Sequence, residues 1–545
     1  MKSVRDGAAG QRVDDYVRFF VDTCRCPSIA LAITDTVEVL HAGYYGKADI
    51  AAQRDITDKT AFYFASVGKA FTAAALLKLA EERLVRLDDP VKAYLPWFQV
   101  GGAANRFDDI TLHQLMTHTA GIPSGSDFTP ASPFEVYALR EVKRRFAPGA
   151  TFHYSNVGYK ALGHVIEHVT GLPYAEAVSK SVLDPLRMTE SYGALTHSIR
   201  DRMAVGYVPR FDDRPYYVGC SLEPAPSLEV GTGDGSIVTT VEDLCKFLRM
   251  LLNTGDSPAA RVLSAESIAL MCAPAVKNAF HNESLSYGYG ITIEHRADSV
   301  LLSHGGEAPG FKSYYVVDPV RGFAVAATSN GPFPVYPAAY FALDCYRCER
   351  DGLELPPVPA FDATRFDQPA SFEGQYACGN RRFDLKRKGD QVFFCHDGVE
   401  TPLRGRGPKC SLVEHPDFSR FLLETAADGS GAFWHGGDLW TKEQPGRAPS
   451  TPVTIPAQWR PFPGHYRSHN PWLSNFRIVA RAGQLVFVEP SNETYSLVPT
   501  DDPLLFHLAA GDAELPEWIE FSAPVEGVSL RVSYSGGDYY RFFTD

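Results

Sequence analysis

A serine and a lysine three residues apart, Ser66 and Lys69, stand at the start of an Ala/Leu-rich stretch that favours a helix. Residues at this spacing share a helix face, so the amine could remove the proton of the hydroxyl. If the helix begins near Ser66, the free N–H groups of its first turn would stabilise an oxyanion formed beside that hydroxyl. The pair therefore predicts nucleophilic catalysis with Ser66 as the nucleophile and Lys69 as a base.

Two further polar clusters follow along the chain. The motif Tyr154-Ser155-Asn156 comes after a Pro-Gly turn and before a new helical pattern, which places a phenol, a hydroxyl and an amide at a helix entrance. The motif His304-Gly305-Gly306 ends an apolar run, as expected where a strand edge lets a substrate backbone approach closely. We expect this strand to donate N–H groups to a ligand.

Taken together and in this order, Ser-x-x-Lys, Tyr-Ser-Asn and His-Gly-Gly resemble the three motifs of the serine β-lactamase and penicillin-binding-protein superfamily. The nearest likeness is to its class C-like esterases and D-aminopeptidases. Residues 87–91, 110–121, 235–244 and 287–290 also look like sequences of this family and fall in its order. The resemblance covers roughly residues 10–350, and it implies the fold and active site of a serine hydrolase.

The resemblance also implies roles for single residues. Ser66 would be the nucleophile, and Lys69 and Tyr154 would share its proton, since a lysine among apolar neighbours and a tyrosine beside a cation both deprotonate more readily. Asn156 would hold Lys69 or the substrate amide in place. The N–H groups of Ser66 and Glu307 would form the oxyanion hole, while the Glu307 carboxylate could bind a substrate amine.

His304 departs from the pattern of β-lactamases and DD-peptidases, which usually carry a lysine at this position. A histidine with a reference pKa of about 6.5 is mostly neutral at pH 7, so free-carboxylate ligands such as penicillins should bind less well. The change suits esters, amides or peptides whose C-terminus is blocked or remote. We also expect the imidazole to hydrogen-bond the Tyr154 hydroxyl.

Together with the resemblance, these features imply a D-amino-acid-specific aminopeptidase or amidase, and we expect no metal and no cofactor. A carboxylesterase, an acyltransferase or peptide cyclase, and a catalytically inactive binding protein are the alternatives. The segment His164-Val-Ile-Glu167-His168 spells the His-x-x-Glu-His of inverted zinc metallopeptidases, but it continues the helix after Tyr-Ser-Asn, as in the serine-enzyme family. We interpret His113, His118 and His153 as structural, and Asp127 as a residue that could line the cleft.

Composition limits the possible partners and the compartment. The 545 residues carry a net charge of −13 with no evident basic patch, which argues against nucleic acid. No signal peptide or membrane-spanning run is evident, and the ten scattered cysteines suit reduced thiols. The pair Cys345-x-x-Cys348 stands alone, without a second such pair or nearby histidines, and is interpreted as structural. We therefore expect a cytoplasmic protein with a small peptide, amide or ester substrate and possibly a homodimer.

The pattern of predicted secondary structure changes after a proline-rich linker at residues 355–359. Before it, helical and strand patterns alternate, and residues 29–33 and 322–327 are predicted to share one antiparallel sheet. Beyond it, short Gly-bounded strands dominate, and Phe372-Glu-Gly-Gln-Tyr376 recurs as Phe462-Pro-Gly-His-Tyr466. The prediction is an α+β, β-lactamase-like catalytic domain (1–355) with a helical subdomain, followed by two small antiparallel β-barrels (361–447 and 456–545).

This layout resembles the D-aminopeptidases of the family, in which two eight-stranded barrels follow the catalytic domain. The resemblance implies that a loop of the last barrel can enter the cleft and restrict substrates to short ones. The sequence does not identify that loop.

Overall fold

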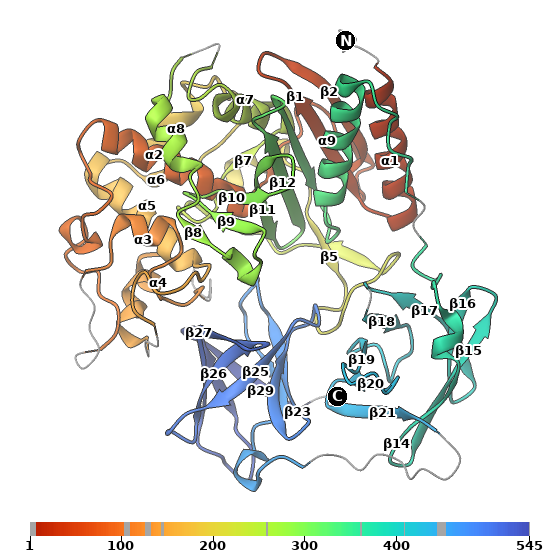
Figure 1. Cartoon of the computed structure of the whole chain (residues 1–545). Coiled ribbons are helices and arrows are strands. Elements are labelled where there is room, and N and C mark those ends of the chain that lie inside the picture. Colours follow the sequence, from red (N-terminus) through yellow and green to blue (C-terminus); the bar gives the residue numbers. More distant parts are fainter. Residues whose placement is uncertain are drawn as a thin grey trace. The chain divides into compact units, whose positions relative to one another are not determined.

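The computed structural model describes residues 7–102, 109–125, 132–142, 146–257, 260–359, 362–407, 409–443 and 454–543. Contacts divide the chain into two compact units (Figure 1). The N-terminal unit comprises Met1–Val208, Ser221–Pro359 and Asn470–Trp472, and the barrel unit comprises Pro209–Cys220, Ala360–His469 and Leu473–Asp545.

A nine-stranded antiparallel sheet forms the centre of the N-terminal unit, in the order β3-β2-β1-β13-β12-β11-β10-β9-β8. Strand β1 pairs directly with β13 and places Ile33 opposite Val325, so the two segments share one antiparallel sheet as predicted. Both strands are buried along their whole length, which is typical of strands covered on both faces. The strands are β1 Ser28–Thr34, β2 Val39–Asp49, β3 Arg54–Asp55, β8 Val276–Lys277, β9 Leu285–Tyr287, β10 Thr292–His295, β11 Val300–Ala308, β12 Phe311–Asp318 and β13 Phe323–Ser329. Two short ladders pair β4 Phe62–Tyr63 with β7 Val238–Thr239, and β5 Tyr207–Pro209 with β6 Leu222–Pro224.

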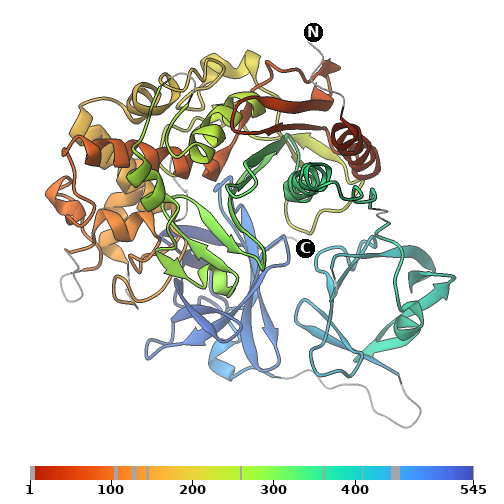
Figure 2. The same ribbon diagram turned by 45° about the horizontal axis from the view of Figure 1, so that its top comes forward.

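Helices cover both faces of this sheet (Figures 1 and 2). Helices α1 and α9 pack against each other and against strands β2, β12 and β13, whereas α7 packs on β1 and β13 from the other side. The remaining helices form a helical subdomain around α2, which is mostly apolar and buried over nearly its whole length. The helices are α1 Ala8–Cys24, α2 Gly68–Glu81, α3 Leu112–Met116, α4 Ser132–Ala138, α5 Asn156–Thr170, α6 Tyr174–Val178, α7 Val241–Leu252, α8 Ala265–Met271 and α9 Tyr336–Asp351. None of the described helices combines the length and apolar composition needed to cross a bilayer.

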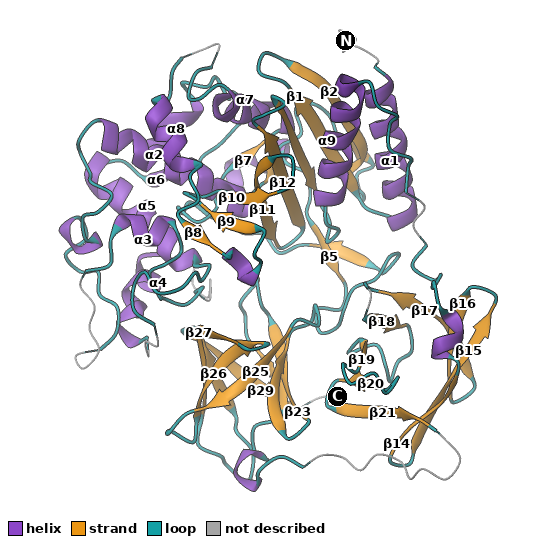
Figure 3. Cartoon of the chain, in the orientation of Figure 1, coloured by secondary structure: helices purple, strands orange, loops and turns teal. Residues whose placement is uncertain are grey.

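Two closed, eight-stranded antiparallel barrels follow, so the predicted α+β fold with two barrels is confirmed (Figure 3). Their common sequence motif has a common contact: Tyr376 donates a hydrogen bond to Phe372 O at 2.9 Å, and Tyr466 donates one to Phe462 O at 2.7 Å. Barrel 1 consists of β14 Gly374–Cys378, β15 Arg381–Lys388, β16 Gln391–His396, β17 Val399–Gly405, β18 Cys410–Val413, β19 Leu423–Thr425, β20 Phe433–His435 and β21 Asp438–Lys442, preceded by the short helix α10 Pro369–Phe372. Barrel 2 consists of β22 Gly464–Arg467, β23 Asn475–Arg481, β24 Gln484–Val488, β25 Thr494–Pro499, β26 Leu505–Ala510, β27 Ala513–Phe521, β28 Arg531–Tyr534 and β29 Gly537–Phe542.

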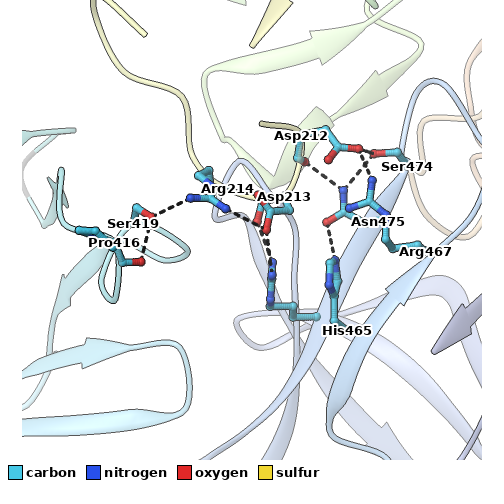
Figure 4. Close-up of polar contacts among 10 residues, drawn as sticks. Asp212, Asp213, Arg214, Pro416, Ser419, His465, Arg467, Ser474 and Asn475 are labelled. Atoms are coloured by element: carbon cyan, nitrogen blue, oxygen red, sulfur yellow. Dashed lines mark hydrogen bonds and ion pairs between the residues drawn. The ribbon is translucent and has the colours of Figure 1, made fainter. Parts of the chain in front are cut away.

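The segment between β5 and β6 belongs to the barrel unit, although it interrupts the N-terminal sequence. Figure 4 shows its polar contacts with both barrels. The Asp212 carboxylate accepts hydrogen bonds from Arg467 at 2.5 Å and Ser474 at 2.7 Å, and Arg214 donates one to Ser419 at 3.0 Å. The boundaries of the two units are therefore not contiguous in sequence, since residues 209–220 belong to the barrel unit and residues 470–472 to the N-terminal unit.

Candidate active site

Ser66 lies on a tight turn at the entrance of α2. The turn is a short 3-10 helix, Ala65–Val67, and Ala65 has a left-handed φ of 47°, a conformation that a residue with a Cβ adopts rarely. Gly235 packs against this turn so closely that a Cβ on it would lie 2.6 Å from the backbone of Ala65. Ser66 thus lies on a strained turn that its neighbours hold in place.

Lys69 is fully buried one turn further along α2. Its Nζ donates hydrogen bonds to Ser66 Oγ at 3.1 Å, to Asn156 Oδ1 at 2.7 Å and to the carbonyl oxygen of Asp234 at 2.6 Å. The predicted helical spacing therefore brings the Lys69 amine within hydrogen-bond distance of the Ser66 hydroxyl. The Asn156 amide contacts the same amine, as expected. The carbonyl of Asp234 was not predicted, although three glycines in residues 231–235 indicate a close backbone approach.

The Tyr154-Ser155-Asn156 motif forms the start of α5. Ser155 is the N-cap residue, and its hydroxyl accepts a hydrogen bond from the N–H of Gly158 at 3.1 Å. The helix therefore begins at Asn156, which directs the Asn156 amide towards Lys69. The Tyr154 ring lies beside the same amine, with its centroid 4.8 Å from Lys69 Nζ, so the structure brings the side chains of Ser66, Lys69, Tyr154 and Asn156 together.

His118 holds this motif in place through contacts with Ser155 and Tyr154, a role that the sequence did not reveal. Its Nδ1 accepts a hydrogen bond from the Ser155 N–H at 2.9 Å, and its ring lies 4.3 Å from the Tyr154 ring. Burial and the charge of Lys69 hold the pKa of His118 well below its usual range. His118 is therefore a neutral positioning residue, in agreement with its structural interpretation.

Strand β11 has an unpaired edge beside the turn Ala65–Val67. Strand β10 pairs only with residues 300–303 of β11, so the following residues up to Ala308 have no strand partner on that side within the described chain. Gly306 lets this strand approach, since a Cβ there would collide with the carbonyl oxygen of Phe64. Gly305 is exposed at the edge. Backbone N–H groups on such an edge can bind a substrate carbonyl.

The carboxylate of Glu307 is 76% exposed and forms an ion pair with Lys312 on the neighbouring strand β12. The pairing neutralises much of its charge. The contact therefore weakens the expectation that this carboxylate binds a substrate amine, and it leaves the N–H of Glu307 as the group of interest.

His304 is buried at the end of the paired part of β11. Its Nδ1 lies 2.7 Å from the carbonyl oxygen of Gly305, which can only accept, so Nδ1 carries the proton and Nε2 accepts from the Tyr287 hydroxyl at 2.9 Å. Tyr287 thus takes the place that we expected for Tyr154, because it projects from strand β9, which is separated from β11 only by β10. Burial, with a contribution from the charge of Lys69, lowers the pKa of His304 to about 3, so the ring is neutral at pH 7.

The other candidate residues from the sequence lie in separate places. His113 contacts the Tyr289 hydroxyl at 2.7 Å, and His164 contacts Ser132 through Nε2 and Glu167 through Nδ1. Across the described ranges, no group of three or more His, Cys, Asp or Glu side chains could hold a metal ion. The ten cysteines are free thiols, and Asp127 lies outside the described residues.

Comparisons with known proteins match the same part of the chain. Residues 13–343 match a family model described as Beta-lactamase. Protein flp of Staphylococcus aureus (strain N315) is 25% identical over 329 residues, which cover 59% of this chain and 63% of that protein. The Unguisins hydrolase ungD of Aspergillus violaceofuscus (strain CBS 115571) is 27% identical over 374 residues, which cover 63% of this chain and 64% of that protein. The chain thus spans less than two thirds of the length of these relatives.

One solved structure extends the similarity towards the C-terminus. The octameric penicillin-binding protein homologue from Pyrococcus abyssi aligns with a TM-score of 0.58 and 25% identity, over 80% of this chain and 100% of that chain. The matched family region contains Ser66, Lys69, Tyr154, Asn156 and His304.

Proposed function

Because the chain belongs to the β-lactamase family of serine hydrolases, we propose that it cleaves amide or ester bonds of small substrates through an acyl-enzyme on Ser66. The observation that carries the proposal is the 3.1 Å hydrogen bond between Lys69 Nζ and Ser66 Oγ. A serine hydroxyl is a weak nucleophile until a neighbouring base accepts its proton. The name of the related Unguisins hydrolase supports hydrolysis as the reaction class.

In the proposed acylation step, Ser66 Oγ attacks the substrate carbonyl carbon while its proton moves to Lys69 or Tyr154. The oxyanion lies between the N–H groups of Ser66 and Glu307. Tyr154 then donates a proton to the leaving amine or alcohol as the C–N or C–O bond breaks. Water attacks the acyl carbon, loses its proton to the same two side chains, and releases the acid with Ser66 restored. The open edge of β11 supports this arrangement, because it lies against the turn that carries Ser66.

For the substrate, we propose an amide or ester without a free carboxylate near the scissile bond, and first of all a D-aminoacyl amide. The neutral His304 supports this choice, since its pKa of about 3 leaves no permanent positive charge at the position where related enzymes hold a carboxylate. The D-preference rests on the resemblance to D-aminopeptidases and is the part of the proposal most open to test.

A panel of substrates on the wild type and on Ser66→Ala tests the proposal. We expect turnover of short p-nitrophenyl esters and of D-alanyl p-nitroanilide, slow nitrocefin hydrolysis, and no turnover by Ser66→Ala. Mass spectrometry after treatment with a fluorophosphonate should find one label, on Ser66. Fast ester but no anilide turnover would indicate a carboxylesterase, and product formation that depends on an added amine would indicate an acyltransferase. An unlabelled Ser66 with no turnover would contradict enzyme function and favour a binding protein.

Self-association is a further part of the proposal. The Pyrococcus abyssi homologue is described as octameric, which supports an oligomer of this chain, whereas the sequence suggested a homodimer. Light scattering coupled to size-exclusion chromatography distinguishes a monomer from these two states. A cytoplasmic location stays a prediction that cell fractionation tests.

A further inference from the structure

The barrel unit contains a cavity of about 380 Å³ whose charged lining is entirely basic. Arg420 of barrel 1 lines it together with Arg477, Arg541 and His465 of barrel 2, and its remaining lining residues are glycine or apolar. Its volume is in the range of sites for small ligands. An all-basic cavity is unexpected in a chain whose net charge is −13, so this cavity concentrates positive charge against the overall trend.

Two of the three guanidinium groups have no carboxylate partner. Arg477 is paired with Asp213, whose carboxylate lies 3.2 Å from it and whose carbonyl oxygen accepts a second hydrogen bond at 2.7 Å. Arg541 instead donates to backbone carbonyl oxygens, of Pro463 at 2.7 Å and of Pro461 at 3.1 Å. Neither Arg420 nor Arg541 forms an ion pair within the part of the chain that the structure describes. The cavity therefore holds about two uncompensated positive charges.

The surroundings of Arg477 and His465 show a prearranged site. Figure 4 shows His465 beside Asn475: Asn475 donates to the Asp212 carbonyl oxygen at 3.0 Å, so its Oδ1 accepts from His465 Nε2 at 3.0 Å. Burial lowers the pKa of Arg477, and the charges of Arg420 and Arg214 act in the same direction. The like charges repel one another in this partly desolvated place, and an anion would relieve that repulsion.

A second cavity, of about 580 Å³, shares Arg420 with the first but has a different charge balance. There Arg381 is paired with Asp438 at 2.7 Å, and the carboxylate of Asp417 also lines the wall. The excess of positive charge is therefore confined to the smaller cavity. Phe542 and Phe543 line that cavity and are 45% and 70% exposed, which offers an apolar surface to the organic part of a ligand.

We propose that the cavity between Arg420, Arg477 and Arg541 binds a small oxyanion with two negative charges, either a phosphate group or a dicarboxylate. Guanidinium groups bind both through paired, charge-assisted hydrogen bonds. Because Arg420 comes from barrel 1 and the other two arginines come from barrel 2, the bound anion bridges the barrels and stabilises them against unfolding. The site is independent of the chemistry at Ser66.

Calorimetric titration and thermal unfolding of the full chain test this site. Inorganic phosphate and succinate serve as the two probes, at pH 7.5 and at an ionic strength held constant with NaCl. We expect saturable binding of one anion per chain and a rise in the unfolding temperature of the barrels. Arg420→Gln should weaken binding by about tenfold or more, since it removes a charge-assisted contact. Tighter binding of inorganic phosphate or of succinate assigns the class of the ligand.

Two further variants distinguish specific binding in the cavity from nonspecific electrostatic screening. Arg387→Gln removes the same charge from an exposed position on β15 and should bind like the wild type. Arg420→Lys keeps the charge and should retain part of the affinity, while circular dichroism verifies that both Arg420 variants are folded. Absence of binding at millimolar concentrations of both probes, or equal binding by the wild type and folded Arg420→Gln, would overturn the proposal.

Discussion

Replacing Asn156 with aspartate tests whether Lys69 works as a base. The Asn156 Oδ1 atom lies 2.7 Å from Lys69 Nζ, so Asn156→Asp puts a carboxylate in direct contact with the buried amine. An opposite charge at such a distance raises the pKa of an amine by about one to three units, which corresponds to about 1.4–4 kcal/mol. If the neutral amine accepts the Ser66 proton, activity at pH 7 should fall by about 10- to 1000-fold. The rising limb of the kcat/KM profile should move up by the same one to three units.

The matched control is Asn156→Ala, which removes the same hydrogen bond without adding a charge. It should lower kcat/KM because Lys69 loses a positioning contact. The pH at which kcat/KM rises should, however, stay near the wild-type value. The assay is p-nitrophenyl ester hydrolysis between pH 5 and pH 10, with circular dichroism as a check of folding. If the aspartate variant shows the same pH limb as the alanine variant, Lys69 does not act as a base, and the reasoning is refuted.

Three further predictions concern the supports of the site. Gly306→Ala should destabilise the N-terminal unit by about 1–3 kcal/mol or more, because the added Cβ collides with the carbonyl oxygen of Phe64; thermal unfolding measures the loss, and an unchanged transition would contradict the packing. Tyr287→Phe leaves the buried Nε2 of His304 without its donor, so urea unfolding should show a loss of about 1–3 kcal/mol, and a loss below the error of the measurement would argue against this hydrogen bond. Because the pKa of His304 in the folded state is about 3, against 6.5 in the unfolded chain, its neutral state stabilises the fold above pH 6.5 and this stability is lost as the pH falls towards 3. At pH 5 the loss should be about 2 kcal/mol relative to pH 7, and it should be absent in His304→Gln; an equal loss in that variant would assign it to other groups.

The sequence predicted the parts of the site that depend on local spacing. Ser66 and Lys69 are three residues apart on one helix, so their contact follows from helix geometry alone. The start of α5 at Asn156 follows from the capping side chain of Ser155. The presence of two similar barrels was also predicted, because the repeated Phe-x-Gly-x-Tyr motif marks the first strand of each module.

The contacts between distant segments could not be predicted from the sequence in this way. Nothing in the local pattern indicates that the Asp234 carbonyl accepts from Lys69, that Tyr287 donates to His304, or that His118 holds Ser155. Each of these contacts joins segments at least 17 residues apart, so it depends on how the elements pack. The polar loop that contains Asp212 poses the same problem, because its composition does not say which unit its side chains bind.

The geometry of the proposed oxyanion site depends on backbone contacts. Ser313 of β12 donates a hydrogen bond to the Phe64 carbonyl oxygen at 2.8 Å, and the bare Cα of Gly306 lets β11 approach the same group. These two contacts fix the turn that carries Ser66 against the strand whose open edge offers N–H groups. Side chains that line the rest of the cleft can therefore vary without disturbing the distance between the nucleophile and these donors. We expect such an arrangement to accept both ester and amide substrates, and it implies that substrate preference in this chain can change at positions such as His304 without changes in residues 64–69.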